Sequence, residues 1–170
     1  MFFVLRPVRV LLKALLTQST PAQMSWGFAL GVLVGLVPKG NLLAIALGIV
    51  VAMLRVNLGV ATATAIAVTF AASWFDPVSD SIGRFVLSLP SLQQFWIQLY
   101  NTPVMPWTDF NNSIVMGSFL LGLGLLWPLS RSSRPVFEHY ADLLSEHARH
   151  WRLAKVLLGA EWADRLGSVE

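Results

Sequence analysis

The residues best able to do chemistry in this chain are a few cations and amides set among long apolar stretches. Lys39, Gly40 and Asn41 interrupt an apolar run in the segment GLVPKGNLL, and Arg55 and Asn57 separate two further apolar runs. Lysine and arginine head groups bind phosphates and carboxylates. Free backbone groups at a break between two membrane helices can also contact ions and anionic groups. We therefore predict a lipid-binding or anion-binding site formed by these five residues.

The same cations also have purely structural explanations. The long stem of Lys39 lets its ammonium reach an interface from an ordinary tight turn, and Arg55 can anchor the boundary of the next apolar segment. A lysine held inside a bilayer costs about 2.5 to 3.5 kcal/mol on insertion scales, so a buried Lys39 needs an anionic partner or a wet cavity. The sequence leaves both interpretations open.

The acidic residues in the middle of the chain are best explained as structural. Asp76 precedes Pro77 and is expected to cap a helix that begins there. Asp80 and Arg84 have the spacing of an i, i+4 ion pair. All three histidines lie within residues 139–150 without a matching acidic pattern, and the chain has no cysteine. With no catalytic Ser/His/Asp order and no phosphate-binding glycine loop, we expect no metal, no cofactor and no enzyme activity.

Composition places these residues in a membrane protein. Hydrophobic residues make up 55% of the chain and charged residues 12%, with a mean hydropathy of +0.64. An ordinary soluble domain carries about a quarter charged residues. Lysine and arginine gather near both ends, within residues 6–13 and 131–165, and such loops stay in the cytoplasm. We predict an all-α, multi-pass integral membrane protein with both termini cytoplasmic.

Hydrophobic patterning divides the chain into three parts. Residues 1–20 are expected to form an amphipathic interfacial helix, with a short soluble helix as the alternative. The membrane domain, residues 21–130, is expected to contain a broken helical hairpin (24–54), a full transmembrane helix (56–75), a periplasmic connection with a short helix around SLQQFWIQLY (76–112) and a second transmembrane helix (113–130). Residues 131–170 are expected to form a cytoplasmic amphipathic helical tail.

The broken hairpin allows two geometries. Each half is shorter than the roughly 20 residues that a span requires. In one geometry the hairpin is re-entrant, with residues 38–41 at a buried tip; in the other both halves are short spans and the tip reaches the outer face. We favour the re-entrant hairpin.

Glycines repeat every four residues in the first half of this hairpin. Gly27, Gly31 and Gly35 lie on one helix face, which lets another backbone approach closely. A second copy or another protein could supply that backbone. We expect instead the second half of the hairpin, because it is adjacent in sequence.

Three segments, GFALGVLVGLVPKGNLL, LRVNL and FDPVSD, in this order resemble a family of small prokaryotic inner-membrane proteins filed as a domain of unknown function. The resemblance covers about residues 22–142. In that family a Gly-rich helix runs into a Pro-Gly turn, an Arg-x-Asn follows, and an Asn-Pro-x-Thr-like motif closes the next helix. Asp76 stands where Asn is usual and Ser79 where Thr is usual, so the chain looks like a divergent subfamily. The matching positions are Gly27, Gly31, Gly35, Pro38, Gly40, Arg55, Asn57 and Pro77.

The resemblance implies a bacterial inner-membrane location and a gene often placed beside that of an AsmA-like protein, a long periplasmic bridge thought to move lipids. Our leading hypothesis is a non-enzymatic accessory protein that assists lipid handling or anchoring with such a partner, with Lys39 and Arg55 contacting anionic head groups. The alternative is a small homo-oligomeric channel or transporter subunit with Thr62, Thr64 and Lys39 along a polar path. A structural membrane scaffold is a second alternative. The sequence has no stripe of basic and aromatic residues of the kind that binds nucleic acid, so we expect no nucleic-acid partner.

Overall fold

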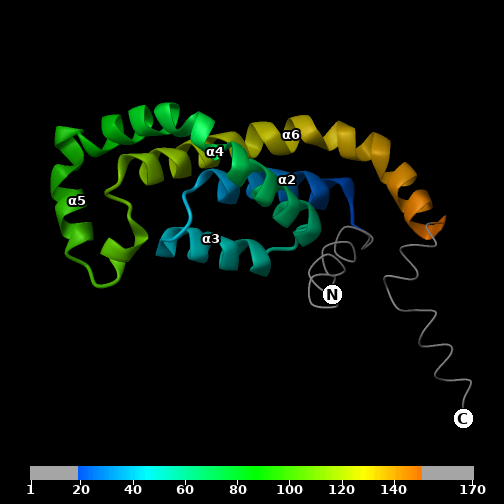
Figure 1. Ribbon diagram of the computed structural model, residues 1–170, viewed down its shortest axis with the longest axis horizontal. Coiled ribbons are helices and arrows are strands. Elements are labelled where there is room, and N and C mark those ends of the chain that lie inside the picture. Colours follow the sequence, from blue (N-terminus) through cyan, green and yellow to red (C-terminus); the bar gives the residue numbers. More distant parts are fainter. Residues whose placement is uncertain (1–18, 151–170) are drawn as a thin grey trace, which may run out of the picture.

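The computed structural model describes residues 19–150, and side chains over residues 19–139. The expected amphipathic helix at residues 1–20 and the end of the tail therefore lie almost entirely outside the described residues. The described part contains no strand, so its all-α class is confirmed. The elements are α2 (Pro21–Leu36), α3 (Leu42–Met53), α4 (Leu58–Leu87), the 3-10 turn η1 (Pro90–Leu92), α5 (Gln93–Tyr100), the 3-10 turn η2 (Met105–Thr108) and α6 (Ser113–His150) (Figure 1).

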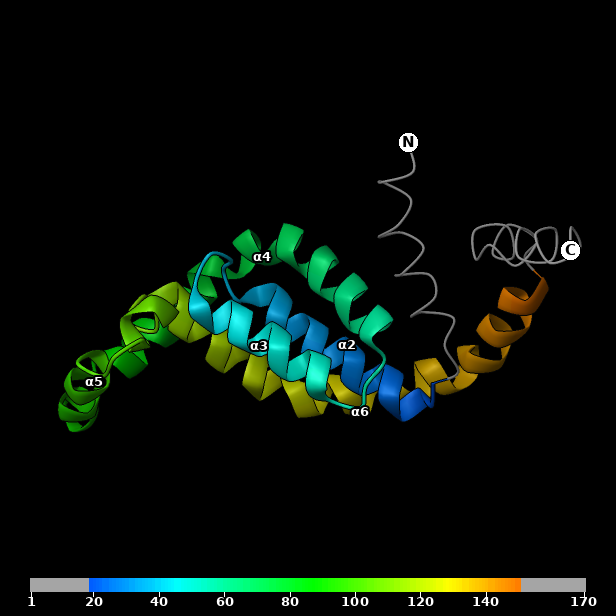
Figure 2. The same cartoon turned by 90° about the horizontal axis from the view of Figure 1, so that it is seen from below.

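Three of these helices, α2, α4 and α6, pack against one another, and α3 lies at their side. Figure 2 shows α2 between α4 and α6, with α3 running alongside it. A small core joins Leu30 and Leu33 of α2 to Ala61 of α4 and Val51 of α3. The start of α2 and the end of α6 lie at one end of the molecule, and α5 lies at the other (Figure 1). The segment 88–112, here called the cap, touches α3 through η2.

Helix α2 begins where the sequence predicts. The Thr20 hydroxyl accepts from the Gln23 amide at 3.2 Å, and the Gln23 side chain accepts from the Thr20 amide at 3.0 Å. This reciprocal capping box satisfies two amides that have no partner within the helix. Within the cap, the expected short helix is also present as α5.

The glycine face of α2 packs against α4. A Cβ added to Gly31 would lie 2.5 Å from the Ala61 carbonyl oxygen, and one added to Gly35 would lie 2.6 Å from the Val68 Cβ. Gly27 approaches α4 in the same way. The expectation that this face meets the second half of the hairpin is therefore wrong. Adjacency in sequence matters less here because α4 offers its own small residues to the glycine face.

A second close crossing joins α4 to α6, and it was not anticipated. A Cβ on Gly83 would overlap the Ser113 carbonyl oxygen, and a Cβ on Gly117 would overlap that of Ser79. Each helix thus contributes a serine and a glycine four residues apart, the small-xxx-small pattern of close membrane helix packing. Gly122 completes the arrangement where α6 meets α2. The two serine–glycine pairs are visible in the sequence, but nothing there indicates that they face each other.

Helix α4 continues through Pro77 to Leu87. The expected end of this helix at residue 75 is therefore wrong, and Asp76 lies inside a helix instead of capping one. A proline removes one helical hydrogen bond. Packing beyond it compensates, because Ser79 and Gly83 are buried against α6.

Helix α6 is also longer than expected. It runs without a break from Ser113 to His150 and includes Pro128 and Pro135. The expected boundary between a span ending at residue 130 and a separate tail from 131 is therefore absent from the backbone. The Arg134 Nε atom lies 2.8 Å from Glu138 Oε1, an i, i+4 ion pair just beyond the second proline. The helix curves toward its C-terminal end (Figures 1 and 2).

Candidate functional site

Lys39 closes the C-terminal end of α2. Its ammonium donates hydrogen bonds to the carbonyl oxygens of Val37 at 2.6 Å, Gly35 at 3.3 Å and Val34. An ammonium has three donors, and the last carbonyls of a helix have no partner within the helix. Positive charge at this end also complements the helix dipole. The side chain is exposed, but in this arrangement its donors all serve α2.

Gly40 and Asn41 shape the turn that follows. Gly40 has a φ of 101°, a backbone conformation that favours glycine. Asn41 is buried, and its side-chain oxygen accepts from the Ala44 amide at 2.9 Å, which caps α3. Its side-chain amide donates to the Pro38 carbonyl at 3.0 Å. Both ends of the Asn41 side chain are therefore used within the turn.

Asn57 performs a similar task at the start of α4. Its side-chain oxygen accepts from the Val60 amide at 2.9 Å, and its side-chain amide donates to the Ser19 hydroxyl at 3.0 Å. Its own backbone amide donates to the Gln23 carbonyl at 3.1 Å. This buried residue both caps α4 and ties the start of α4 to the start of α2.

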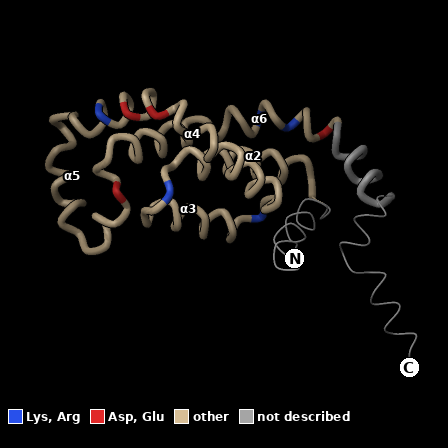
Figure 3. The backbone as a smooth tube through the Cα atoms, in the orientation of Figure 1, with Lys and Arg blue, Asp and Glu red and all other residues tan. Residues whose placement is uncertain are grey.

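Arg55 differs from the other expected binding residues. It lies in the short connection between α3 and α4, is exposed, and forms no hydrogen bond or ion pair with any described residue. Lys39 and Arg55 lie at opposite ends of α3, so about 18 Å of helix separates them (Figure 3). The five expected residues therefore do not form one site, and Arg55 is the one whose head group is available to an external anion.

A groove lies beside Arg55, where α3 faces α2 and α4. It encloses about 250 Å³ and is partly open. No charged side chain lines it, and Thr62 carries the single hydroxyl in its walls. Its lining includes Gly31, Gly48, Val51, Leu58, Ala61 and Thr62.

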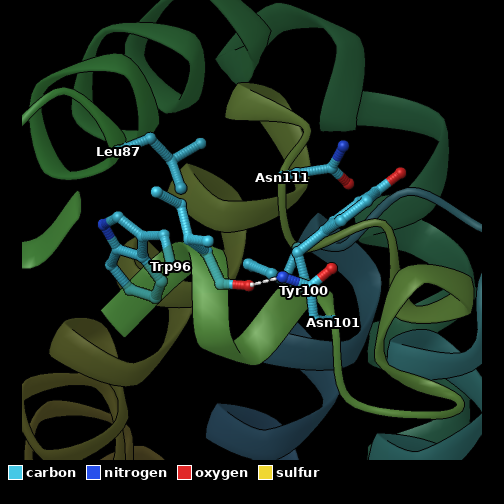
Figure 4. A pocket seen from close by; sticks show the side chains of 7 residues that line it. Leu87, Trp96, Tyr100, Asn101 and Asn111 are labelled. Atoms are coloured by element: carbon cyan, nitrogen blue, oxygen red, sulfur yellow. Dashed lines mark hydrogen bonds between the residues drawn. The ribbon is translucent and has the colours of Figure 1, made fainter. Parts of the chain in front are cut away.

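A second cavity, of about 440 Å³, lies in the cap below the end of α4. Figure 4 shows its aromatic and amide lining. The ring centroids of Trp96 and Phe110 are 6.1 Å apart, and those of Tyr100 and Phe110 are 6.4 Å apart. The Asn101 side-chain amide donates to the Ile97 carbonyl at 2.9 Å. The sequence predicts a short helix here but not the cavity, because Phe110, which completes the ring cluster, lies outside α5.

The acidic group on α4 links two helices. The Arg84 Nε atom lies 2.7 Å from Asp80 Oδ2, which confirms the expected i, i+4 pair. The Ser113 hydroxyl donates to the other carboxylate oxygen of Asp80, a contact to α6 that the sequence does not reveal. The Asp76 side chain forms no hydrogen bond or ion pair with the described residues. Asp80 and Arg84 thus have the structural role expected for them.

Large apolar side chains lie on the outer surface, and the closest helix crossings are made by small residues. Exposed fractions reach 83% for Phe70, 82% for Trp74 and 80% for Met53, whereas Ser79 and Ser118 are each 1% exposed. Two helical stretches, Leu58–Leu87 and Ser113–His139, are long and apolar enough to cross a membrane. In their most apolar windows only 11% and 33% of residues are buried. Most of this apolar surface therefore has no covering within the described chain.

Residues 6–142 match the protein family described as "Uncharacterized protein conserved in bacteria (DUF2062)". The chain belongs to the DUF2062 family. A protein of Treponema pallidum (strain Nichols), described as an "Uncharacterized protein", is 27% identical over 146 residues, which cover 86% of this chain and 90% of the relative. No solved structure matches the chain. The expected membership in a bacterial family of unknown function is thus confirmed, and the match begins earlier than residue 22.

Two places in the described part of this DUF2062 chain are open to a ligand. One is the uncharged groove, whose lining residues Ala52 and Leu58 flank Arg55 in the sequence, and the other is the aromatic cavity of the cap with its two amides. Lys39, Asn41, Asn57 and Asp80 serve instead as caps, turns or links between helices.

Proposed function

We propose that this chain is a non-enzymatic accessory protein of the bacterial inner (cytoplasmic) membrane that binds anionic lipid. The observation that carries the proposal is the placement of large apolar side chains on the outside, with serine and glycine at the closest helix crossings. Membrane helices associate through small residues in this way, because lipid already surrounds their apolar surfaces. A bacterial family and two helices of spanning length support the same placement.

The relative lengths of the helices support the proposed re-entrant hairpin. The Thr69 hydroxyl contacts the Gly35 carbonyl at 3.4 Å, so the end of α2 is level with Thr69. Thr69 lies about 17 Å along α4, whereas the whole of α4 is about 45 Å long. The hairpin thus reaches less than half the length of α4. The start of α2 and the end of α6 lie at the same end, which favours both termini on the cytoplasmic side (Figure 1).

The two-span geometry has one observation in its favour. The turn η2 of the cap touches α3, so the start of α3 is near the segment that we place in the periplasm. Single cysteines at Lys39 and Ile45, labelled from each side of sealed vesicles, separate the geometries in this cysteine-free chain. Gln94→Cys in the cap and Ser132→Cys on α6 serve as exposed controls for the two sides. Labelling from the cytoplasmic side only, or none, is expected; labelling from the periplasmic side would overturn the re-entrant hairpin.

Lipid binding is proposed to depend on Arg55 more than on Lys39. The Lys39 donors already serve α2, whereas Arg55 has no described partner. Arg55→Ala should reduce the amount of anionic phospholipid that co-purifies with the protein, and Arg55→Lys should keep most of it. Lipid co-purification that is unchanged in both Arg55→Ala and Lys39→Ala would refute the lipid hypothesis.

The proposed partner is an AsmA-like lipid-transfer protein, on the strength of the family resemblance. Its test is co-purification of the two proteins from membranes, with and without Arg55→Ala. The channel alternative gains less support, because Thr64 packs against Gly31 and Thr62 lines the groove within the same chain. A path between copies would need other polar residues.

A further inference from the structure

We propose that the groove between α2, α3 and α4 binds part of one acyl chain of an anionic phospholipid whose phosphate contacts Arg55. This inference rests on the proposed membrane location and lipid binding, and it names the site and the ligand class. The sequence pattern predicts a cation that meets a head group, but it gives no indication of the groove beside that cation.

The walls of the groove suit a hydrocarbon chain. They are formed by Gly, Ala, Val and Leu side chains, with Thr62 as the single hydroxyl group. The volume of about 250 Å³ is just below the range of about 300 to 1,000 Å³ that is typical of small-molecule pockets. The groove therefore accommodates part of a chain and not a whole lipid, and it remains partly open for the rest.

Charge favours a lipid over a protein segment as the occupant. Arg55 lies between Ala52 and Leu58, which both line the groove. No aspartate or glutamate occurs in residues 19–75, which include α2, α3 and the apolar part of α4. The part of the chain that forms the groove walls thus offers the guanidinium no carboxylate, and phosphate is an anion that guanidinium groups recognise well.

The helix α3, which forms one wall of the groove, exposes apolar side chains to the expected lipid. The outer residues of α3, among them Ile45, Ile49 and Met53, are exposed and apolar. An acyl chain entering from the bilayer exchanges one apolar environment for another, so the groove itself gives little selectivity. The selectivity should therefore come from the head group. One cation near the membrane surface, here Arg55, corresponds to a preference of about fivefold for an anionic lipid.

The test uses variants that fill the groove without disturbing the helix contacts. A Cβ at Gly48, a residue of the groove wall, meets no atom within 4 Å, so the helix itself has room for the branch point of Gly48→Leu. Thr62→Phe narrows the groove from the α4 wall, where Thr62 is exposed. Gly124→Leu is the matched control, because Gly124 also has open space but lies on α6 outside the groove.

The full chain, reconstituted in vesicles of phosphatidylglycerol and phosphatidylcholine, is labelled with a phosphatidylglycerol that carries a photoreactive acyl chain. We expect crosslinks to peptides containing Ala52 or Thr62 in the unmodified protein and in Gly124→Leu. These crosslinks should fall at least fivefold in Gly48→Leu and Thr62→Phe. Native mass spectrometry should show that Arg55→Ala loses the preference for phosphatidylglycerol while Arg55→Lys keeps it.

Other outcomes separate the two levels of the proposal. If Arg55→Ala loses the lipid preference but Gly48→Leu and Thr62→Phe keep the crosslinks, lipid binding stands and the groove is overturned as its site. If neither Arg55→Ala nor the groove variants change bound lipid, both proposals fail. Crosslinks between two copies of the chain through groove residues would show that protein covers the groove, and would overturn this inference.

Discussion

The bundle of α2, α4 and α6 and the neighbouring helix α3 are built in opposite ways. In the bundle, glycines bring backbones so close that an added Cβ would collide with the next helix. Along α3, Gly48 faces open space, and Ile45 and Met53 are exposed. Close backbone contacts therefore fix the positions of α2, α4 and α6, whereas α3 is only weakly held. Binding sites commonly lie in such less constrained regions, because they have to admit a ligand.

The largest loss of stability is expected when a glycine at a helix crossing of the bundle is replaced by a larger residue. Gly117→Leu places a side chain on the Ser79 carbonyl oxygen. We expect a loss of about 3 kcal/mol or more, the upper range for overpacking, and loss of the folded state in detergent. Thermal unfolding followed by circular dichroism measures it. Gly124→Leu, on the same helix but in open space, is the control, and equal stability of the two variants would contradict the prediction.

The next largest effect is expected where α4 is tied to α2. Asn57→Ala removes the cap on the Val60 amide and the hydrogen bond to Ser19. Loss of a cap and of a buried hydrogen bond should cost about 2 kcal/mol. Ser19→Ala removes only the second interaction and should cost less than half as much, measured by the same unfolding assay. Equal losses in the two variants would show that the cap contributes nothing.

A smaller loss of stability is expected at Lys39, where the structural and the lipid-binding interpretations predict different results. Lys39→Met removes the cation from the end of α2 and should cost about 1 kcal/mol of stability. Bound anionic lipid should stay within twofold of the unmodified protein, because Arg55 carries that interaction. A large loss of lipid with unchanged stability would return Lys39 to a binding role.

The smallest effect, of opposite sign, is expected on α3. Gly48→Ala should stabilise the protein by about 0.5 kcal/mol, because alanine is a better helix former and its Cβ meets open space here. The same change at Gly31 should be destabilising, since its Cβ would lie 2.5 Å from a carbonyl oxygen. If both changes had the same sign, the contrast between bundle and α3 would be wrong.

Local signals in the sequence predicted local structure well. The Thr20 capping box, the turn with Gly40 and the short helix in the cap are all present, because each depends on residues a few positions apart. The expected helix end before Pro77 was wrong, because contacts with α6 outweigh a lost hydrogen bond in α4. The helix α6 likewise continues past the expected boundary at residue 130.

The candidate site was harder to predict than the turns. Lys39 and Arg55 are close in sequence, but the intervening helix α3 holds them apart. A lysine that has helix-end carbonyls within reach binds them instead of an external ligand. Lys39 does so with the carbonyl oxygens of α2. The groove and the aromatic cavity are formed by segments distant in sequence, so no motif indicates them.

The unbroken course of α6 has a mechanical consequence. At 38 residues the helix is about 57 Å long, nearly twice the roughly 30 Å thickness of a bilayer core. It is held at the Gly117 crossing near its beginning and against α2 as far as Phe137, whose ring centroid lies 6.4 Å from that of Phe28. Beyond Phe137 the described helix continues for about 20 Å to His150. This last part acts as a rigid arm, so a tilt of the bundle is passed on to whatever contacts the His150 end.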